Sequence, residues 1–365
     1  MKFSIDKTEL QNCLAVVQKG VSTRSTLPVL SGILIEAAKD SIVLQSTDLD
    51  LSIQMTAPAL IEEEGRTVVP GKLFSDIVKS MPDAAIHITA QDGEVKITCD
   101  KSTFSVKTLA AEDFPGFPKV ETSSSIEIPF AQFVNMVKKV SKVVSRDESR
   151  IVLTGILVAV EDGKLRMVAT DSYRLALTEV DAPQEDAQDF SAVISGTFMN
   201  EVASLPPTDD PVKIALSDNQ IVINCGNTVF INRRIEGNYP NYKQLLPDGF
   251  NSRAVVSLSD LTASVKRAAL LSSASAPIKF DLNIASQTLQ ITVTSPDVGS
   301  VQETLVCEIE GEDVEIAFNS AYVTEGLTSV KGDKVAFEVQ SSLKPGIFKA
   351  LEPENFLYLI MPVRI

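Results

Sequence analysis

The sequence predicts an α+β fold in which β structure dominates and one structural unit occurs three times. Residues of similar type recur at a nearly constant spacing of 123 or 124 positions. Aromatic residues that each open an apparent helix are Phe74, Phe198 and Tyr322, and threonines that each end a strand-like run are Thr47, Thr170 and Thr294. A chain of 365 residues with 44% hydrophobic residues is long and apolar enough for two or three packed cores.

The three copies start alike, with a strand that leads into an amphipathic helix. The starting segments are Ser4-Ile-Asp-Lys-Thr-Glu-Leu, Glu127-Ile-Pro-Phe-Ala-Gln-Phe and Val255-Val-Ser-Leu-Ser-Asp-Leu. Small and polar residues typical of short linkers separate the copies, in Thr122-Ser-Ser-Ser and Pro247-Asp-Gly-Phe-Asn-Ser. We therefore predict three domains, over residues 1–121, 126–247 and 253–365.

Within each copy, a helix followed by several short strands occurs twice, so we expect about six helices among roughly twenty strands. The spacing of apolar residues predicts helices over 8–18, 72–80, 130–144, 197–204, 258–271 and 320–329. The β-branched segments Ala85-Ile-His-Ile-Thr and Val95-Lys-Ile-Thr-Cys predict a hairpin with a turn at Asp92-Gly93.

Composition and missing motifs exclude several function classes. The single histidine, His87, lies in a strand-like alternation and is expected to be exposed, and one histidine cannot build a His-His metal site. The four cysteines lie more than 80 residues apart, which argues against zinc sites and disulfide scaffolds. Neither a phosphate-binding glycine loop nor the serine elbow of a catalytic triad occurs. We therefore expect no enzyme activity, no cofactor and no metal.

Charge and hydropathy bear on the compartment and the partners. Apolar runs such as 151–160 stop well short of the ~20 residues that cross a bilayer, and charged residues precede any signal-peptide core. The expected compartment is cytoplasmic, with no membrane partner. The 48 acidic and 33 basic residues give a net charge of −15, which repels nucleic acid at long range. A local basic stripe can still hold a phosphate backbone.

Motifs spread along the chain carry a resemblance to one family. They are Thr26-Leu-Pro-Val-Leu, Thr47-Asp-Leu-Asp, Asp113-Phe-Pro, Ala169-Thr-Asp-Ser-Tyr-Arg-Leu-Ala, Tyr239-Pro-Asn-Tyr, Leu246-Pro and Tyr358-Leu-Ile-Met-Pro-Val-Arg-Ile. With them the whole chain resembles the bacterial DNA polymerase III beta subunit, the DNA sliding clamp. The resemblance implies a head-to-tail homodimer, a six-domain ring of DNA-clamp (processivity) domains with helices lining the hole and sheets outside. A clamp-loader complex would open this ring around double-stranded DNA, which the ring would encircle without sequence preference.

Basic residues gather where the resemblance places the ring lining, above all on the predicted helix at 130–144 and its counterpart in the third copy. The predicted DNA-binding residues are Arg24, Lys72, Lys138, Lys139, Lys142, Arg146, Arg150, Lys266 and Arg267. Taken alone, such a charge run is a plain solvated helix face. Gly196 and Thr197 replace an Arg-Lys pair of other members, which leaves DNA contact there open.

The resemblance also implies a pocket for short motifs with a Gln and a Leu/Phe pair, carried by replicative and repair polymerases and other proteins with a clamp-binding motif. The predicted pocket residues are Leu153, Thr170, Tyr173, Arg174, Leu175, Pro240, Leu245, Asn319, Tyr322, Leu359, Met361, Pro362, Val363 and Arg364. Leu343 and Pro345 are weaker candidates, and Gln244 and Tyr173 depart from the Arg and His of other members. Without the resemblance, the Met361-Pro-Val ending is a terminal strand that completes a sheet.

Four apolar residues match positions where two chains of this family meet, although ordinary core packing also explains them. They are Phe104, Val106, Leu270 and Leu271.

Two other function classes remain as alternatives. An enzyme with paired carboxylates is one, because Thr47-Asp-Leu-Asp puts Asp48 and Asp50 on one face of a strand. The recurrence of the first aspartate at Asp171 favours turn chemistry instead. A β-rich peptide-binding module with no DNA role is the other, and a basic stripe confined to the helices would argue against it.

Overall fold

The structure is a computed structural model that describes residues 1–22, 26–182, 190–351 and 355–364. Its backbone contacts divide the chain into two compact units. Unit 1 comprises Met1–Ala131 and Ser204–Arg234, and unit 2 comprises Gln132–Ala203 and Ile235–Ile365. The division falls inside the second sequence copy because the strands of that copy belong to two different sheets. The predicted domain limits stay a prediction.

The described residues contain six α-helices, close to the predicted positions. They are α1 (Lys7–Val17), α2 (Gly71–Ser80), α3 (Phe130–Val140), α4 (Gly196–Ala203), α5 (Leu258–Ala269) and α6 (Ser320–Leu327). The third is shorter than predicted, because the chain tightens into a single 3₁₀ turn at Ser141–Val143 and is extended at Val144. Successive valines lose side-chain freedom in a helix, which favours such an early end.

Side-chain caps explain where several helices begin. Asp6 accepts hydrogen bonds from the backbone N–H groups of Thr8 and Glu9, at 2.8 and 3.1 Å, and so begins α1. Ser257 caps α5, and Asn319 caps α6. Each helix directly follows a strand, as the repeated sequence unit predicts.

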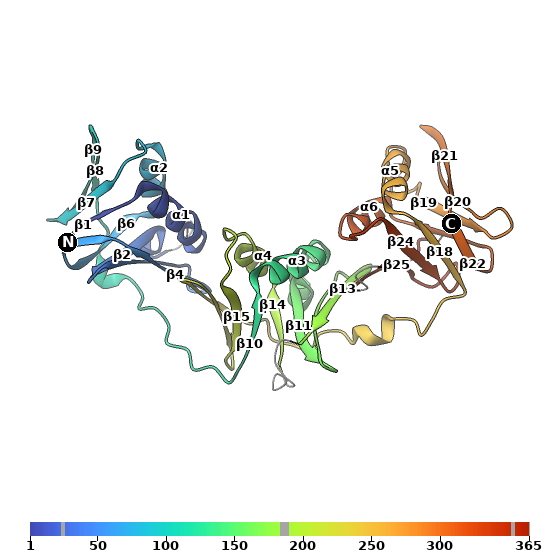
Figure 1. Cartoon of the computed structure of the whole chain (residues 1–365), viewed down its shortest axis with the longest axis horizontal. Helices are drawn as coiled ribbons and strands as arrows, with labels where there is room; N and C mark the ends of the chain where they lie inside the picture. The colour runs from blue at the N-terminus through green and yellow to red at the C-terminus, as the bar shows by residue number, and fades with distance from the viewer. Residues whose placement is uncertain (23–25, 183–189, 352–354, 365) are drawn as a thin grey trace. The chain divides into compact units, whose positions relative to one another are not determined.

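Unit 1 contains two antiparallel sheets (Figure 1). The first has the order β5 (Leu60–Glu63), β1 (Lys2–Ile5), β7 (Ile86–Gln91), β8 (Glu94–Cys99) and β9 (Ser102–Lys107). The second has the order β10 (Ser124–Pro129), β15 (Pro211–Leu216), β16 (Gln220–Cys225), β17 (Thr228–Arg233), β4 (Leu51–Pro58), β3 (Ser41–Thr47), β2 (Gly32–Ala38) and β6 (Gly65–Pro70). The predicted hairpin is β7 and β8, and its turn residues Asp92 and Gly93 have positive φ angles.

Unit 2 also contains two antiparallel sheets. The larger has the order β14 (Ser191–Ser195), β11 (Gly155–Glu161), β12 (Lys164–Thr170), β13 (Arg174–Asp181), β26 (Phe356–Ile360), β25 (Gly346–Ala350), β24 (Lys334–Val339), β18 (Ser252–Ser257) and β22 (Glu308–Gly311). The smaller has the order β21 (Gly299–Val306), β20 (Thr288–Ser295), β19 (Ile278–Asn283) and β23 (Val314–Phe318). The described residues thus hold 26 strands, more than the sequence predicts.

Both large sheets join strands of successive copies in the same way: the strand that follows the repeated threonine in one copy pairs with the last strand of the next copy. The strand after the repeated threonine is β4, β13 or β21, and the last strand of each copy is β9, β17 or β26. In unit 1, β4 of the first copy pairs with β17 of the second, and in unit 2, β13 of the second copy pairs with β26 of the third. The rule leaves β9 and β21 as edge strands of their sheets.

Helices pack in pairs against the sheets and bury two of the three repeated aromatic residues. In unit 1, α1 contacts α2, β3 and β4, and in unit 2, α5 contacts α6 and β18 to β21 (Figure 1). Phe74 and Phe198 are buried on α2 and α4, whereas Tyr322 on α6 keeps part of its surface exposed. The third aromatic is therefore available at the surface.

Lys139 departs from the prediction that it lies on an exposed basic face. Its side chain is buried, while its neighbour Lys138 on α3 is exposed. The Lys139 Nζ atom donates to Asn355 Oδ1 at 2.8 Å and lies 5.6 Å from the centre of the Phe356 ring. Burial, with a smaller contribution from the charge of Lys331, lowers the pKa of the Lys139 ammonium to about 8.

This buried lysine predicts a pH-dependent stability. The unfolded chain keeps the ordinary lysine pKa of 10.5 and binds the proton more tightly than the folded chain, so the penalty from Lys139 is full below pH 8 and disappears above pH 10.5. Lys139→Met should raise the free energy of unfolding by about 1 to 3 kcal/mol at pH 7, and the gain should shrink as the pH approaches 10.5. Chemical unfolding at both pH values measures it. Lys138→Met is the matched control and should change little, and an equal gain at both pH values would contradict the argument.

Candidate functional site

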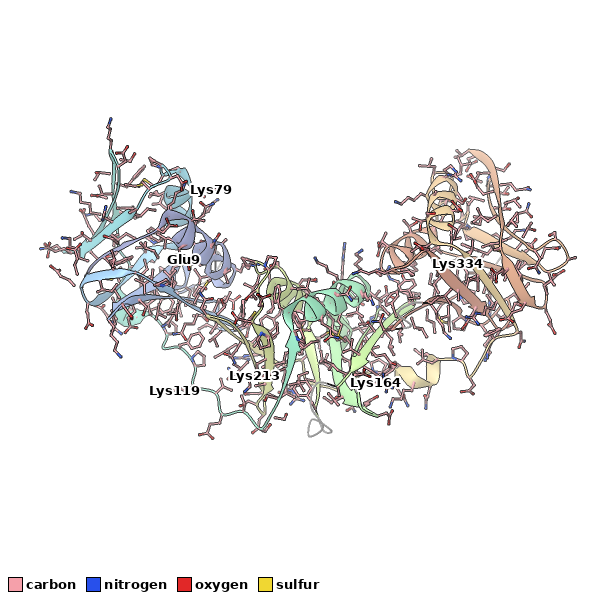
Figure 2. The ribbon with its side chains drawn as sticks, in the orientation of Figure 1. Glu9, Lys79, Lys119, Lys164, Lys213 and Lys334 are labelled. Carbon is pink, nitrogen blue, oxygen red and sulfur yellow. The ribbon has the colours of Figure 1, made fainter. Side chains whose placement is uncertain are left out.

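Basic side chains on strands and basic side chains on helices differ in whether they form ion pairs. Seven strand lysines each pair with a carboxylate of the same sheet: Lys2, Lys107, Lys164, Lys213, Lys279, Lys334 and Lys349. The helix lysines Lys72, Lys79, Lys138 and Lys266 are exposed and have no carboxylate partner within the described part of the chain. Figure 2 labels members of both groups, with Lys164 and Lys213 on strands and Lys79 on α2. Among strand cations, Arg66 and Lys96 lack a pair among the described residues.

The predicted DNA-binding residues fall into four groups. Arg24 lies outside the described residues, and Lys139 is buried. Exposed without an ion pair among the described residues are Lys72, Lys138, Lys142, Arg146 and Lys266. Arg150 and Arg267 are exposed but paired, since Arg150 Nε lies 3.0 Å from Asp147 Oδ2 and Arg267 makes two 2.7 Å hydrogen bonds to Glu303. The Glu303 partner also raises the pKa of Arg267.

The predicted partner pocket separates into a buried framework and an exposed rim. Leu153, Thr170, Leu175 and Leu359 are buried. Exposed members are Tyr173, Pro240, Leu245, Met361, Val363 and Arg364. The connector, residues 235–251, packs against the cluster that contains Leu175 and Leu359, through Tyr239, Tyr242 and Leu246. A ligand would therefore meet the rim residues first.

Arg174, predicted to contact peptide carbonyls or acids, binds several groups of its own chain. Its buried guanidinium donates to Asp171 Oδ2 at 2.9 Å, to Glu325 Oε2 at 2.6 Å and to the Lys142 carbonyl at 3.1 Å. It also lies 4.4 Å from the centre of the Tyr322 ring. With a further hydrogen bond from Nη1 to the Tyr358 hydroxyl, four of the five N–H groups of Arg174 have partners, and these bonds hold the start of β13 against α6.

Aromatic and C-terminal residues form the exposed part of this region. Tyr173 is 59% exposed and stacks on Tyr322 with ring centres 6.4 Å apart. The Met361 N–H donates to the Tyr173 carbonyl, and the Val363 N–H donates to the Ala317 carbonyl, each at 2.8 Å. The segment 361–364, which follows β26, therefore runs alongside the turn at Tyr173 and the strand β23 that contains Ala317.

A cavity of about 570 Å³ borders the ending and includes the weaker candidate Leu343. Val363 and Arg364 line it together with residues 313–317, which include the start and most of β23. Sequence reasoning missed these β23 residues, since nothing in their pattern differs from an ordinary strand. Asn319, the other predicted polar residue here, caps α6 with its side chain.

The predicted chain interface residues differ in exposure. Phe104 on the edge strand β9 is 40% exposed, and Leu270 directly after α5 is 83% exposed. Val106 is buried within its own chain, which is a departure from the expectation, and Leu271 is partly buried.

Of the two carboxylates Asp48 and Asp50, the first has a turn role, and Asp50 Oδ1 lies 3.2 Å from Arg233 Nε. Asp48 Oδ1 accepts from the backbone N–H groups of Asp50 and Leu51, and Asp171 Oδ1 accepts in the same way from Tyr173 and Arg174. His87 is exposed on β7, as predicted, and its Nδ1 atom lies 2.7 Å from the Ser4 hydroxyl.

The residues that the structure describes contain no helix that is long and apolar enough to cross a membrane. Within the same residues, no group of three or more His, Cys, Asp or Glu side chains is arranged to hold a metal ion.

Comparisons with known proteins agree along the whole chain. Sequence models of the DNA polymerase III beta subunit match its N-terminal domain at residues 1–118, its central domain at 127–241 and its C-terminal domain at 243–364. The beta sliding clamp of Bacillus subtilis is 30% identical over 376 residues, covering 100% of both chains. That of Staphylococcus epidermidis is 29% identical, covering 100% of this chain and 99% of the relative.

Solved structures show the same three-domain fold. The DNA polymerase sliding clamp from Bacillus subtilis superposes with a TM-score of 0.94 at 30% identity, covering 100% of this chain and 99% of that one. The DnaN sliding clamp from Pseudomonas aeruginosa, bound to griselimycin, has a TM-score of 0.94 at 28% identity with 100% of both chains covered. Fold, repeat and sequence together show that this chain belongs to the DNA polymerase III beta subunit family.

Proposed function

We propose that the chain is a DNA sliding clamp, which encircles duplex DNA and tethers the replicative polymerase to it. Family membership supports this, and the distribution of cations is the structural observation that carries it. Seven strand lysines pair within their sheets, with Lys96 as the strand exception, whereas the exposed helix lysines have no carboxylate partner among the described residues of a chain with net charge −15. A polyanion would therefore be attracted to the helices more than to the sheets.

The strand-pairing rule supports a ring of two chains. In each chain, two strands do not take part in this pairing: β9, the last strand of the first copy, and β21, the strand after the repeated threonine of the third copy. Both lie at a sheet edge. If β9 of one chain pairs with β21 of a second chain, the same rule that joins the copies within a chain also joins the chains. Two such head-to-tail contacts use every open edge of this kind and close a ring of six copies. The exposed Phe104 lies on β9 and could bury its ring there.

A closed ring holds DNA by topology and needs no catalytic group, so we propose that the protein is not an enzyme. The free lysines would contact phosphates weakly and without reading bases, which permits sliding. A cytoplasmic clamp loader would open the ring. The exposed rim of Tyr173, Leu245, Met361 and Val363 would receive the apolar anchors of polymerase and repair-protein motifs.

Topological holding predicts tolerance of single charge losses. Lys138→Ala should leave retention on nicked circular DNA within about two-fold of the unchanged chain, because one phosphate contact contributes little to a closed ring. Gel filtration after loading by the matching clamp loader with ATP measures retention. Cutting the circle should release both proteins. Complete loss on the circle from this one change, or retention on linear DNA, would contradict topological holding.

The edge-pairing proposal predicts that one charge on β9 separates the chains. Phe104→Asp should weaken dimerisation by about 100-fold, because it would bury an unpaired carboxylate. Leu60→Asp is the matched control, since Leu60 is 77% exposed on β5 at the opposite edge of the same sheet. Sedimentation velocity should find the control dimeric and Phe104→Asp monomeric. Equal dimerisation of both variants would place the interface elsewhere.

A further inference from the structure

The connector, residues 235–251, carries two residues of the predicted partner pocket on one short turn. Pro240 comes just before the 3₁₀ turn Tyr242–Leu245, and Leu245 ends this turn. Both residues are exposed, Leu245 to 44%. Whatever holds the turn in place therefore also determines where a partner motif would meet Pro240 and Leu245.

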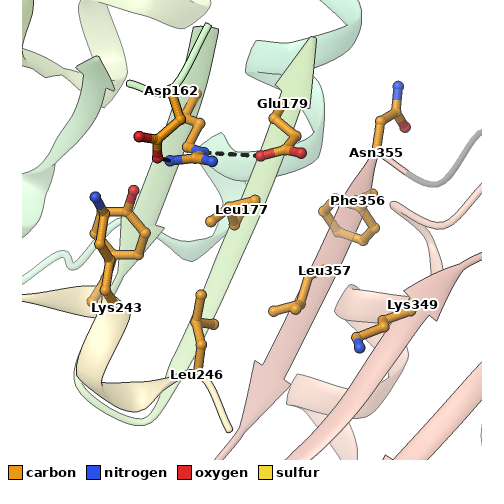
Figure 3. A pocket seen from close by; sticks show the side chains of 11 residues that line it. Asp162, Leu177, Glu179, Lys243, Leu246, Lys349, Asn355, Phe356 and Leu357 are labelled. Carbon is orange, nitrogen blue, oxygen red and sulfur yellow. Dashed lines mark hydrogen bonds and ion pairs between the residues drawn. The ribbon is translucent and has the colours of Figure 1, made fainter. Parts of the chain in front are cut away.

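Apolar packing holds this turn on one side only. Tyr242 is 4% exposed and belongs to the apolar cluster that contains Leu175 and Leu359 of the predicted pocket. On another side the connector borders a cavity of about 560 Å³, which Tyr242 and Leu246 line together with residues of β13 and β26 (Figure 3). Side chains beside an unfilled volume have no packing partners there, so apolar contacts do not restrain the turn on the cavity side.

One carboxylate oxygen provides the missing restraint. Glu161 is the last residue of β11, and its Oε2 atom accepts from the Tyr242 hydroxyl at 3.1 Å and lies 2.8 Å from Lys243 Nζ. The same oxygen accepts from Arg166 Nη1 at 3.0 Å. Arg166 on β12 also donates to Glu179 on β13 at 2.9 Å, so it is held by the sheet. Glu161 therefore links the connector to the sheet through polar contacts.

These contacts keep Glu161 ionised. Burial favours the neutral carboxyl, but its three hydrogen bonds, of which that from Lys243 is the largest, together lower the pKa of Glu161. Burial, with a smaller contribution from the charge of Glu161, raises the pKa of Tyr242 to about 12, so its hydroxyl stays a donor. Hydrogen bonds to an ionised acceptor are stronger than those between neutral groups, which suits a restraint that two residues of the connector share.

We propose that Glu161 is a positioning residue for the partner pocket. Through Tyr242 and Lys243 it holds the 3₁₀ turn against the sheet, so that Pro240 and Leu245 are preorganised for a clamp-binding motif. This role rests on the proposed function, because it needs a pocket that binds such motifs. No sequence motif indicates it, since Glu161 and Tyr242 lie 81 positions apart.

Peptide binding by the full chain tests this role. The probe is fluorescein-Gln-Ala-Ala-Leu-Phe-amide, which contains a Gln and a Leu/Phe pair, and fluorescence anisotropy measures its dissociation constant. Tyr242→Phe removes the hydroxyl but keeps the buried ring, and should weaken binding about five-fold because the peptide must then order the turn. Glu161→Gln should weaken binding to a similar extent. The double variant should be no weaker than the weaker single variant, since both changes break the same link.

Asp181→Asn is the matched control. It breaks the ion pair between Lys164 Nζ and Asp181 Oδ1, which spans 2.6 Å at an end of the same sheet and does not include the connector. The dissociation constant should stay within about two-fold of that of the unchanged chain, because an exposed pair contributes little. Equal weakening by Asp181→Asn and Tyr242→Phe would overturn the proposal.

A double-mutant cycle separates positioning from a general loss of stability. Leu245→Ala should weaken the probe about ten-fold in the unchanged chain but only about two-fold in Tyr242→Phe, because a turn that is no longer held presents Leu245 poorly. An equal effect of Leu245→Ala in both backgrounds would mean that the two residues act independently and would refute the role of Glu161.

Amide hydrogen exchange reports on the turn without any peptide. The Gln244 and Leu246 N–H groups, which bond within the turn, should exchange at least about ten-fold faster in Tyr242→Phe and at the normal rate in Asp181→Asn. Unchanged exchange in Tyr242→Phe would contradict the restraint. If the unchanged chain failed to bind the probe, the partner pocket of the proposed function would be wrong. If it bound the probe and the variants behaved like it, only the positioning role would be wrong.

Discussion

Backbone hydrogen bonding between strands of successive copies is the constraint on which the rest of the structure depends. The β4–β17 and β13–β26 ladders turn separate repeats into continuous sheets, so each copy completes its neighbour. Pairing satisfies the main-chain groups that an edge strand would otherwise leave open. A chain of three copies therefore keeps two edge strands, β9 and β21, that do not take part in this pairing. These two edges are the physical reason to expect a second chain.

The same sheets also organise the electrostatics. Cross-strand neighbours lie close enough for a lysine and a carboxylate to pair, as Lys164 and Asp181 do on β12 and β13. The short helices have few acidic residues near their exposed lysines, so Lys72 and Lys138 keep an uncompensated charge. Most strand lysines of this acidic protein are therefore paired, whereas the exposed helix lysines are not, and Arg66 and Lys96 are the exceptions on strands.

A polar cluster around Arg174 and Tyr358 supports the exposed residues of the predicted partner pocket. Arg174 joins β13 to α6 through Asp171 and Glu325, and the Tyr358 hydroxyl donates to the Tyr322 carbonyl at 2.9 Å. Tyr358 packs directly against Gly326, where an added Cβ would lie 2.2 Å from its ring. These contacts involve side chains that are largely buried, whereas Tyr173, Met361 and Val363 are exposed.

The sequence by itself determined the helices, their order and the threefold repeat, because these depend on local signals. Caps such as Asp6 and the Asp48 turn act over two or three residues, and the periodicity of apolar residues is visible without knowing any contact. Only the tertiary structure decided that Lys139 is buried while Lys138 is exposed, because Asn355 and Phe356 pack over one of two adjacent lysines. The hydrogen bond from Arg174 to Glu325 and the pairing of Leu177 with Leu357 likewise join residues about 150 to 180 positions apart, which no local pattern reveals.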